Sequence, residues 1–218
     1  MRSRNGSGTT SRRGARAAAS LACAAMLAGC TALQPSPQEQ PSLHLLQPAT
    51  ASRSVARADI VLEVAVPRAS PGYDTARIAY VDRPYAIEYY ARSEWADAPA
   101  RMLAPLLARA FEESGGFRAV VRTSTSVQAD LRVDAELVRL HQDFTSKPSH
   151  ADVALRVQVV DAKARRVVAT LVVEEREPAP SEDASGGVAA MNAALGRALD
   201  RTVAFVAEIS RGSRPPGS

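Results

Sequence analysis

Three stretches between residues 131 and 173 alternate apolar and polar side chains, and this pattern is the strongest constraint on the fold. Successive side chains of a β-strand point to opposite faces, so alternation predicts strands with one buried and one solvated face. Residues 161–164 are typical of a turn, so we expect an antiparallel meander. The inward positions are Leu131, Val133, Ala135 and Leu137, then Val153, Leu155, Val157 and Val159, and finally Val167, Ala169, Leu171 and Val173.

The alternation of the first stretch changes phase after Leu137. Val138, Leu140 and Phe144 take the opposite parity from the apolar residues before them. A β-bulge inserts one extra residue and reverses the face of every later side chain. The sequence therefore predicts a bulge near Leu137 and Val138.

Two segments repeat their apolar residues at helical spacing, over residues 97–113 and from about residue 187 to 209. Asp97 is the expected N-cap of the first helix, and Pro99 lies in the first turn, where its missing N–H costs nothing. Pro105 should kink this helix or mark its true start. Both helices are amphipathic, so each must cover a sheet.

Shorter β-branched or apolar runs predict further strands. They fall at residues 42–46, 59–66, 77–81, 86–90 and 117–121, and the third and fourth read as a hairpin. We therefore expect a single α/β (α+β) domain, in which two long amphipathic helices pack a mixed, mostly antiparallel sheet.

The first 29 residues have the pattern of an export signal. Five arginines and no acidic residue occupy the first 16 positions, and residues 17–29 are small and apolar. This stretch is shorter than the roughly 20 apolar residues that span a bilayer core. It ends in Leu27, Ala28, Gly29 and Cys30, which resembles the lipobox of bacterial lipoproteins. That resemblance implies a diacylglyceryl and an N-acyl chain on Cys30, with no other cofactor; the alternative is an ordinary signal peptide cleaved after Ala28 or nearby.

We expect the signal peptide over residues 1–29, the lipidated Cys30 and a flexible leash over 30–58, the folded domain over 59–210 and a disordered tail over 211–218. The leash composition is rich in Pro, Gln and Ser between residues 31 and 41, which cannot bury a core. The other cysteine, Cys23, leaves with the signal, so no disulfide can form.

The charge of the mature chain argues against a nucleic-acid partner. The 27 basic residues include five in the signal peptide, which leaves 22 basic against 23 acidic residues in the exported part. Nucleic-acid binding needs a clustered basic surface, which a net charge of −1 does not suggest.

No residue constellation indicates catalysis or metal binding. The three histidines, His44, His141 and His150, have no metal-ligand spacing with another His, Cys or paired carboxylate. Nucleophile-elbow, phosphate-loop and zinc-helix motifs are absent from the sequence. We therefore expect that this protein is not an enzyme.

All five tyrosines and the single tryptophan lie within residues 73–95. Tyr and Trp are favoured at interfaces because they bury a large area and keep a polar tip. Packing inside the sheet is the alternative explanation. We hypothesise a surface for a partner or a lipid, formed by Tyr80, Tyr85, Tyr89, Tyr90 and Trp95.

Residues 77–117 carry the motifs of a resemblance to a known family. They contain Arg-Ile-Ala-Tyr at 77–80, Ile-Glu-Tyr-Tyr at 87–90, Trp-Ala-Asp-Ala-Pro at 95–99, and a Gly-Gly-Phe turn at 115–117. This block, with the lipobox before it and a terminal helix after it, resembles the ABC-type transport auxiliary lipoprotein family. The resemblance implies a non-enzymatic component of a phospholipid transport system, working with an MCE-domain protein, as in Mla- and Pqi-like systems.

The resemblance also implies a place in the cell envelope, lipid-anchored on the periplasmic face of the outer membrane. Thr31, a non-acidic residue after the cysteine, favours that membrane by lipoprotein sorting rules. Two alternatives stay open: a lipoprotein of another outer-membrane assembly machine, and a periplasmic protein that binds phospholipid or another small molecule.

Overall fold

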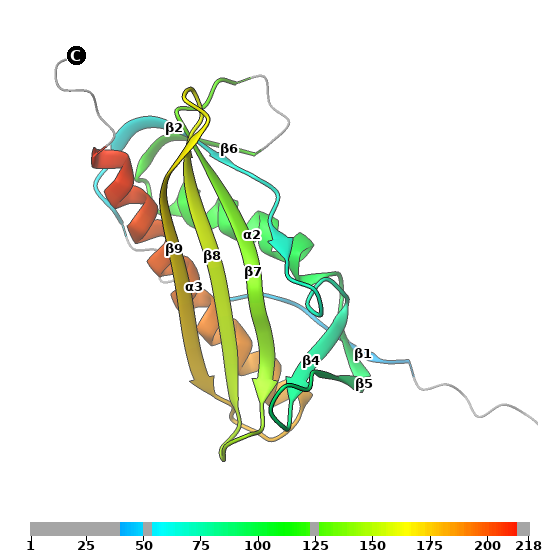
Figure 1. Cartoon of the computed structure of the whole chain (residues 1–218). Helices are drawn as coiled ribbons and strands as arrows, with labels where there is room; N and C mark the ends of the chain where they lie inside the picture. The colour runs from blue at the N-terminus through cyan, green and yellow to red at the C-terminus, as the bar shows by residue number, and fades with distance from the viewer. Residues whose placement is uncertain (1–39, 50–53, 123–126, 213–218) are drawn as a thin grey trace, which may run out of the picture. The chain divides into compact units, whose positions relative to one another are not determined.

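The three alternating stretches form the longest strands of the sheet, β7 (Leu131–Asp143), β8 (His150–Asp161) and β9 (Arg166–Pro178). The computed structural model describes residues 40–49, 54–122 and 127–212, and the folded unit begins at Pro41. The long strands run as an antiparallel meander, as the alternation together with the turn at residues 161–164 predicted (Figure 1). Val133, Val157 and Val159 are fully buried on its inner face.

The predicted bulge in β7 is confirmed. Leu137 pairs with Leu155 and Arg139 with Ala154, so Val138 is the extra residue. Leu140, beyond the bulge, is 1% exposed because the change of phase turns it inward. A second bulge, which the sequence analysis did not predict, leaves Val168 of β9 without a partner on β8. It turns Val167 outward, so the expectation that Val167 is an inward residue is wrong; the side chain is 50% exposed.

One edge of β7 pairs with β8, and the other edge is shared by three short strands. These are β2 (Ala58–Val64), β3 (Arg68–Ala69) and β4 (Arg77–Val81), and all three run parallel to β7. β6 (Phe117–Arg122) extends the sheet beyond β2, whereas β5 (Glu88–Trp95) and then β1 (Ser42–His44) extend it beyond β4. The result is a mixed sheet of nine strands.

Antiparallel pairing is less general than expected. Among the described strands it is confined to β4–β5, β7–β8 and β8–β9, while β1, β2, β3 and β6 all pair in parallel. The reason is that side-chain alternation has the same period in both orientations, so it predicts a strand without giving its direction. The expected hairpin at residues 77–90 is present as β4 and β5.

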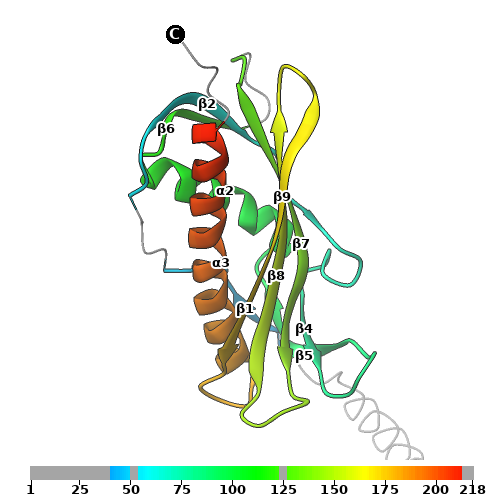
Figure 2. The same ribbon diagram turned by 60° about the vertical axis from the view of Figure 1, so that its left-hand side comes forward.

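Within the described part of the chain, two helices cover the inner face of the sheet, and one of them is much longer than the other. α3 (Ala184–Gly212) has 29 residues and α2 (Pro99–Glu113) has 15. Figures 1 and 2 show both on the same side of the β7–β8–β9 meander. Their apolar faces meet the inner strands in one core, whose fully buried large side chains include Leu62, Leu103, Leu107, Phe111, Leu155, Met191, Leu195 and Leu199.

The start of α2 differs from the prediction at one residue. Ala98, and not Asp97, is the N-cap, and no side chain caps the helix. The Asp97 carboxylate instead accepts the Ala98 N–H at 2.7 Å and pairs with Arg101 one turn later. Pro99 occupies the first turn as expected, and Pro105 lies inside the helix. Gly115, with φ +64°, follows the helix end, a conformation that glycine adopts without strain.

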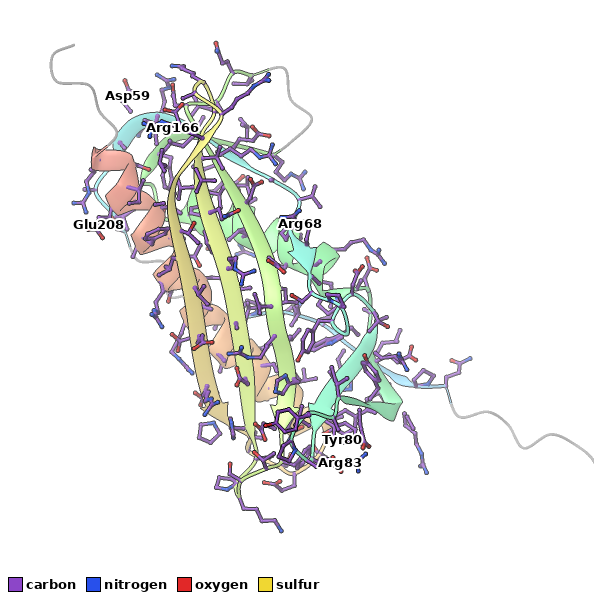
Figure 3. All side chains as sticks on the ribbon, viewed as in Figure 1. Asp59, Arg68, Tyr80, Arg83, Arg166 and Glu208 are labelled. Carbon is purple, nitrogen blue, oxygen red and sulfur yellow. The ribbon has the colours of Figure 1, made fainter. Side chains whose placement is uncertain are left out.

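The outer face of the meander carries charged side chains in cross-strand pairs (Figure 3). Arg156 of β8 donates to Glu136 of β7 at 2.8 Å. Asp152 is 5% exposed and accepts hydrogen bonds from Arg139 at 3.1 Å and Arg176 at 3.2 Å. A buried carboxylate needs such partners to offset its lost hydration.

The folded unit starts upstream of residue 59, inside the segment assigned to the leash. β1 pairs with β5, and Leu46 is 5% exposed in the core. The Gln47 N–H donates to the Asn192 side chain of α3 at 2.7 Å, and the Asn192 amide donates to the Leu45 carbonyl at 3.2 Å. Two hydrogen bonds therefore hold residues 45–47 against α3. At the other end, α3 continues to Gly212, beyond the expected limit of 210.

The first turn of α3 approaches β7 closely at Gly187. A larger side chain at this position should therefore lower the stability of the fold. A Cβ at residue 187 would lie 2.0 Å from Oε1 of Gln142, a fully buried side chain. Gly187→Ala should lower the free energy of unfolding by about 1–3 kcal/mol, the usual cost of overpacking. Urea denaturation followed by circular dichroism measures this change.

Gly212→Ala is the matched control, because a Cβ there meets nothing within 4 Å. Alanine is favoured over glycine by up to about 1 kcal/mol in a helix, so the control should be neutral or slightly stabilising. Equal stability of the two variants would contradict the tight packing at Gly187.

Candidate partner-binding surface

The β4–β5 hairpin and its turn hold four of the five aromatic residues of the proposed surface outside the core, of which Tyr85 is exposed and the other three are half-buried. Tyr80 lies on β4, opposite Glu88, and Tyr89 and Tyr90 are adjacent on β5. Tyr85 lies in the turn with φ 67°, and its side chain is fully exposed at 109%. A positive φ is uncommon for a large side chain, and here it belongs to a residue of the turn whose side chain is wholly in solvent.

Tyr80 and Tyr90 form an aromatic cluster with Phe144. The ring centroids of Tyr80 and Tyr90 lie 4.9 Å apart, and those of Tyr80 and Phe144 lie 5.9 Å apart in an edge-to-face arrangement. Both distances fall in the range favoured for aromatic pairs. Phe144 follows the last residue of β7, so the cluster joins the hairpin to the end of the meander.

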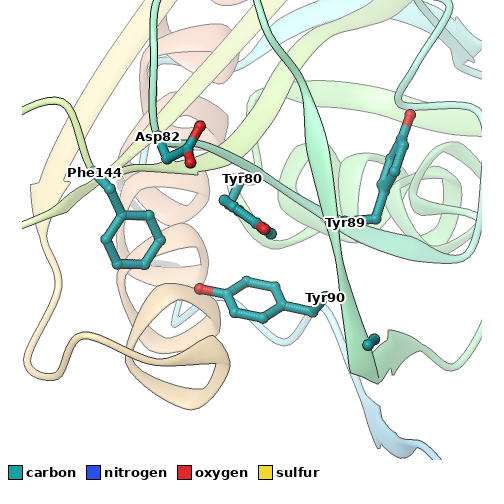
Figure 4. A pocket seen from close by; sticks show the side chains of 6 residues that line it. Tyr80, Asp82, Tyr89, Tyr90 and Phe144 are labelled. Carbon is teal, nitrogen blue, oxygen red and sulfur yellow. The ribbon is translucent and has the colours of Figure 1, made fainter.

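The cluster borders a groove of about 440 Å³ (Figure 4). Its lining is mainly aromatic, with one carboxylate from Asp82 at the rim. The lining residues are Tyr80, Asp82, Tyr89, Tyr90, Ala91 and Phe144. Aromatic and apolar walls with a single charged group are typical of sites that bind a partner side chain or an apolar ligand.

Hydrogen bonds fix the orientation of both tyrosines of the cluster. The Tyr90 hydroxyl donates to Oε1 of Gln142 at 2.7 Å, and the Gln142 amide donates to Ser149 at 2.8 Å. The Tyr80 hydroxyl donates to Glu88 at 2.8 Å, and Glu88 also pairs with Arg83. The rings are therefore held in place before any partner binds, which lowers the entropy cost of binding.

These surroundings keep both phenols protonated. Burial raises the pKa of Tyr90, and the charge of Asp183 raises it further. The hydrogen bond to Glu88 raises the pKa of Tyr80, and desolvation adds to the effect. At neutral pH both groups are neutral donors.

Tyr89 points away from Tyr90, as expected for neighbours on a strand (Figure 4). Its hydroxyl donates to the Gly72 carbonyl at 3.0 Å, and the Arg77 guanidinium lies 3.8 Å from its ring centroid. That distance is suited to a cation–π interaction. Tyr89 therefore secures the loop between β3 and β4 against the hairpin.

Trp95 does not belong to the surface, and this part of the hypothesis is wrong. It is the last residue of β5, is 2% exposed and packs in the core. Its backbone N–H donates to the Ala76 carbonyl at 2.7 Å, and its backbone pairs with that of His44 on β1. Its side chain stands on the face of β5 that the core covers, and it belongs to the buried hydrophobic cluster.

Sequence reasoning missed Phe144 and Asp82 as part of the groove. The change of phase in β7 placed Phe144 on the inward parity, but the strand has ended at Asp143, so the parity no longer applies. Asp82 lies in the segment between the hairpin strands, and its sequence alone is typical of a solvated turn. Cys30, the proposed lipidation site, lies outside the described residues.

The described residues hold no group of three or more His, Cys, Asp or Glu side chains that could bind a metal ion. His141 is buried against Tyr73, whose hydroxyl lies 2.9 Å from its Nδ1 atom, and burial lowers the pKa of this imidazole. Within the same described ranges, no helix combines the length and the apolar character needed to cross a bilayer.

Solved structures with a similar fold are known. The crystal structure of protein XCC0632 from Xanthomonas campestris has a TM-score of 0.67 and 25% identity, covering 78% of this chain and 97% of that chain. An uncharacterised protein has a TM-score of 0.58 and 11% identity over 78% and 98% of the two chains. The hypothetical protein CT253 from Chlamydia trachomatis has a TM-score of 0.53 and 11% identity over 70% and 98%. The last two likenesses show the fold alone.

Among curated proteins, none matches the chain. A family model described as "ABC-type transport auxiliary lipoprotein component" matches residues 42–203, which include every described strand and most of α3. The motifs at residues 77–117 lie inside this match. The chain therefore belongs to the ABC-type transport auxiliary lipoprotein family.

Proposed function

We propose that this protein is a non-enzymatic auxiliary component of an ABC transport system that moves phospholipid between membranes, where it binds the MCE-domain protein of that system. The observation that carries the proposal is the family match over residues 42–203, since the family consists of auxiliary lipoprotein components of ABC-type transport. The phospholipid cargo and the MCE partner come from the resemblance of the motifs at residues 77–117.

The proposed anchor is a lipid on Cys30, on the periplasmic face of the outer membrane. Each buried methylene of an acyl chain contributes about 0.8 kcal/mol, so two or three chains hold a protein stably. The small residues before Cys30 support the modification, and Thr31 supports the outer membrane. The folded unit then needs no membrane-binding surface of its own.

The proposed contact with the MCE-domain protein is the turn and groove of the β4–β5 hairpin. Tyr85 offers a fully exposed aromatic side chain, and the groove beside Tyr80 offers an apolar recess. Exposed aromatic residues next to a recess are the usual anchors of a protein interface. In the described part of this site, hydrogen bonds fix the orientation of aromatic rings. This arrangement suits binding better than catalysis.

The groove also favours a second candidate, direct binding of phospholipid. Its volume of about 440 Å³ lies within the range of small-molecule sites, and its walls are largely aromatic. Native mass spectrometry of the folded protein, mixed with phospholipid, should show a one-to-one complex under this second function. A protein that stays lipid-free, yet co-purifies with an MCE-domain protein, supports the first function alone.

The anchor leads to a direct prediction. Cys30→Ser should move the protein from the membrane fraction to the soluble fraction, because the thiol that carries the acyl chains is lost. Cys23→Ser, in the signal peptide, is the matched control and should leave the protein in the membrane fraction. Fractionation and mass spectrometry of the mature N-terminus measure both results. A Cys30→Ser protein that remains fully membrane-bound would remove the lipid anchor from the proposal.

The partner contact leads to a second prediction. Tyr85→Ala should shift the thermal midpoint by less than about 2 °C, because an exposed side chain contributes little to stability. The same change should weaken association with the MCE-domain protein by about tenfold, the effect expected of an interface anchor. Val66→Ala, which alters another exposed apolar residue (67% exposed), is the control and should change neither quantity. Wild-type affinity of Tyr85→Ala would exclude Tyr85 as an anchor.

A further inference from the structure

The side chains that line the groove of the β4–β5 hairpin offer a hydrogen-bond acceptor but no free donor. Every hydroxyl group of the lining already donates to an acceptor within the protein. The donors are Tyr80, Tyr89 and Tyr90, and their acceptors are Glu88, the Gly72 carbonyl and Gln142. The other lining residues, Asp82, Ala91 and Phe144, have no side-chain donor at neutral pH. A phosphate or carboxylate ligand, which needs donors, therefore finds none on these side chains.

The acceptor that remains available is the carboxylate of Asp82. Its side chain is exposed, and none of the described residues forms an ion pair or a hydrogen bond with it. Arg83, the basic residue next to it, pairs with Glu88 instead, at 2.8 Å. Figure 4 shows Asp82 beside Tyr80 and Phe144, with which it lines the groove. A cation bound here would therefore meet a free carboxylate and aromatic rings together.

Two further carboxylates near the cluster have the same sign of charge. Glu182 and Asp183, just before α3, lie close enough to act electrostatically on the Tyr90 phenol. Their carboxylates accept the backbone N–H groups of Ser149 and Gly186, and no described residue forms an ion pair with either of them. The hydrogen bond from Gly186 lowers the pKa of Asp183, which favours its charged form. The surroundings of the groove therefore attract a cation and repel an anion.

The geometry of the rings favours a flat cation. The ring centroids of Tyr80 and Tyr90 lie 4.9 Å apart, so these two rings contact each other and cannot enclose a quaternary ammonium group between them. A guanidinium group is planar, stacks on a single ring face, and donates two parallel N–H bonds to a carboxylate. The chain itself contains such a stack, because the Arg77 guanidinium lies 3.8 Å from the ring centroid of Tyr89.

We propose that the groove receives an arginine side chain of the protein partner, whose guanidinium group stacks on the aromatic rings and pairs with the Asp82 carboxylate. The arginine belongs to the partner that the proposed function assigns to the hairpin, so this contact rests on that function. Arginine is enriched among the anchors of protein interfaces, because it can stack on an aromatic ring and pair with a carboxylate at once. The phosphate of a phospholipid would meet the same carboxylates, so the groove suits the protein better than the lipid.

Small probes test the chemistry of the groove directly. N-acetylarginine amide and N-acetylcitrulline amide have nearly the same shape, but only the first carries a charge. Added to the mature chain with Cys30→Ser, the arginine probe should shift the NMR signals of the Tyr80 and Phe144 rings. It should also bind about tenfold more tightly than the citrulline probe. Equal binding of the two probes, unshifted ring signals, or tighter binding of phosphocholine than of the arginine probe would overturn the proposal.

Substitutions in the same background identify the groups that hold the probe. Asp82→Asn keeps the size of the side chain and removes its charge, so the arginine probe should bind about tenfold more weakly. The thermal midpoint should shift by less than about 2 °C, because the side chain is exposed. Glu112→Gln, which alters an exposed carboxylate of α2, is the matched control and should change neither quantity. Phe144→Leu removes a ring and should weaken binding about threefold. Wild-type affinity of Asp82→Asn would refute the pairing.

Binding of the MCE-domain protein separates this contact from the proposed function. Asp82→Asn should weaken that association by about tenfold, whereas Glu112→Gln should leave it unchanged. An MCE-domain protein that binds Asp82→Asn as tightly as wild type would overturn the arginine contact and leave the proposed function intact. A chain that binds the arginine probe in the groove, but binds no MCE-domain protein, would support the arginine site and refute the proposed partner.

Discussion

The fold depends on the hydrogen bonding of β7 along both of its edges. One edge is paired with β8 over nearly its whole length, and the other is divided among β2, β3 and β4. These short strands have two to seven residues and could not form a stable sheet alone. β7 gives each of them a template, and each then carries its own neighbours: β6 on β2, and β5 with β1 on β4.

The position of the proposed partner-binding surface follows from this division. β4 joins the last three residues of β7, so the hairpin lies at the end of the meander, next to Phe144. Both helices cover the inner face, and the network around Gln142 links Tyr90 to that buried layer. The aromatic groove thus rests on the rigid part of the molecule, whereas Tyr85 stands out in a turn. Such a combination of a fixed recess and a projecting side chain suits recognition of another protein.

The sequence predicted those features that depend on the period of the side chains and missed those that depend on pairing partners. Alternation predicted the three long strands and the bulge at Val138, because a half-buried strand must alternate, and the turn at residues 161–164 predicted that the strands form a meander. It did not predict the parallel direction of β2, β3 and β4, since direction comes from the path of the chain between strands. Trp95 was misplaced on the surface because the sequence of β5 does not show which of its faces the core covers. Of the residues that line the groove, Tyr80, Tyr89 and Tyr90 belonged to the hypothesised surface, whereas Asp82, Ala91 and Phe144 did not.

The bulge at Val138 has a consequence for how this family tolerates change in length. Upstream of it, odd-numbered residues of β7 face the core, and downstream of it Leu140 and Gln142 do. Loss of one residue at Val138 would convert the bulge into regular pairing, because Leu137 already pairs with Leu155 and Arg139 with Ala154, and Leu140 would stay in the core. The strand should therefore tolerate loss of a residue at the bulge, whereas a residue gained elsewhere in β7 would turn the later side chains to the opposite face, and such gains should be confined to the loops at either end of the meander.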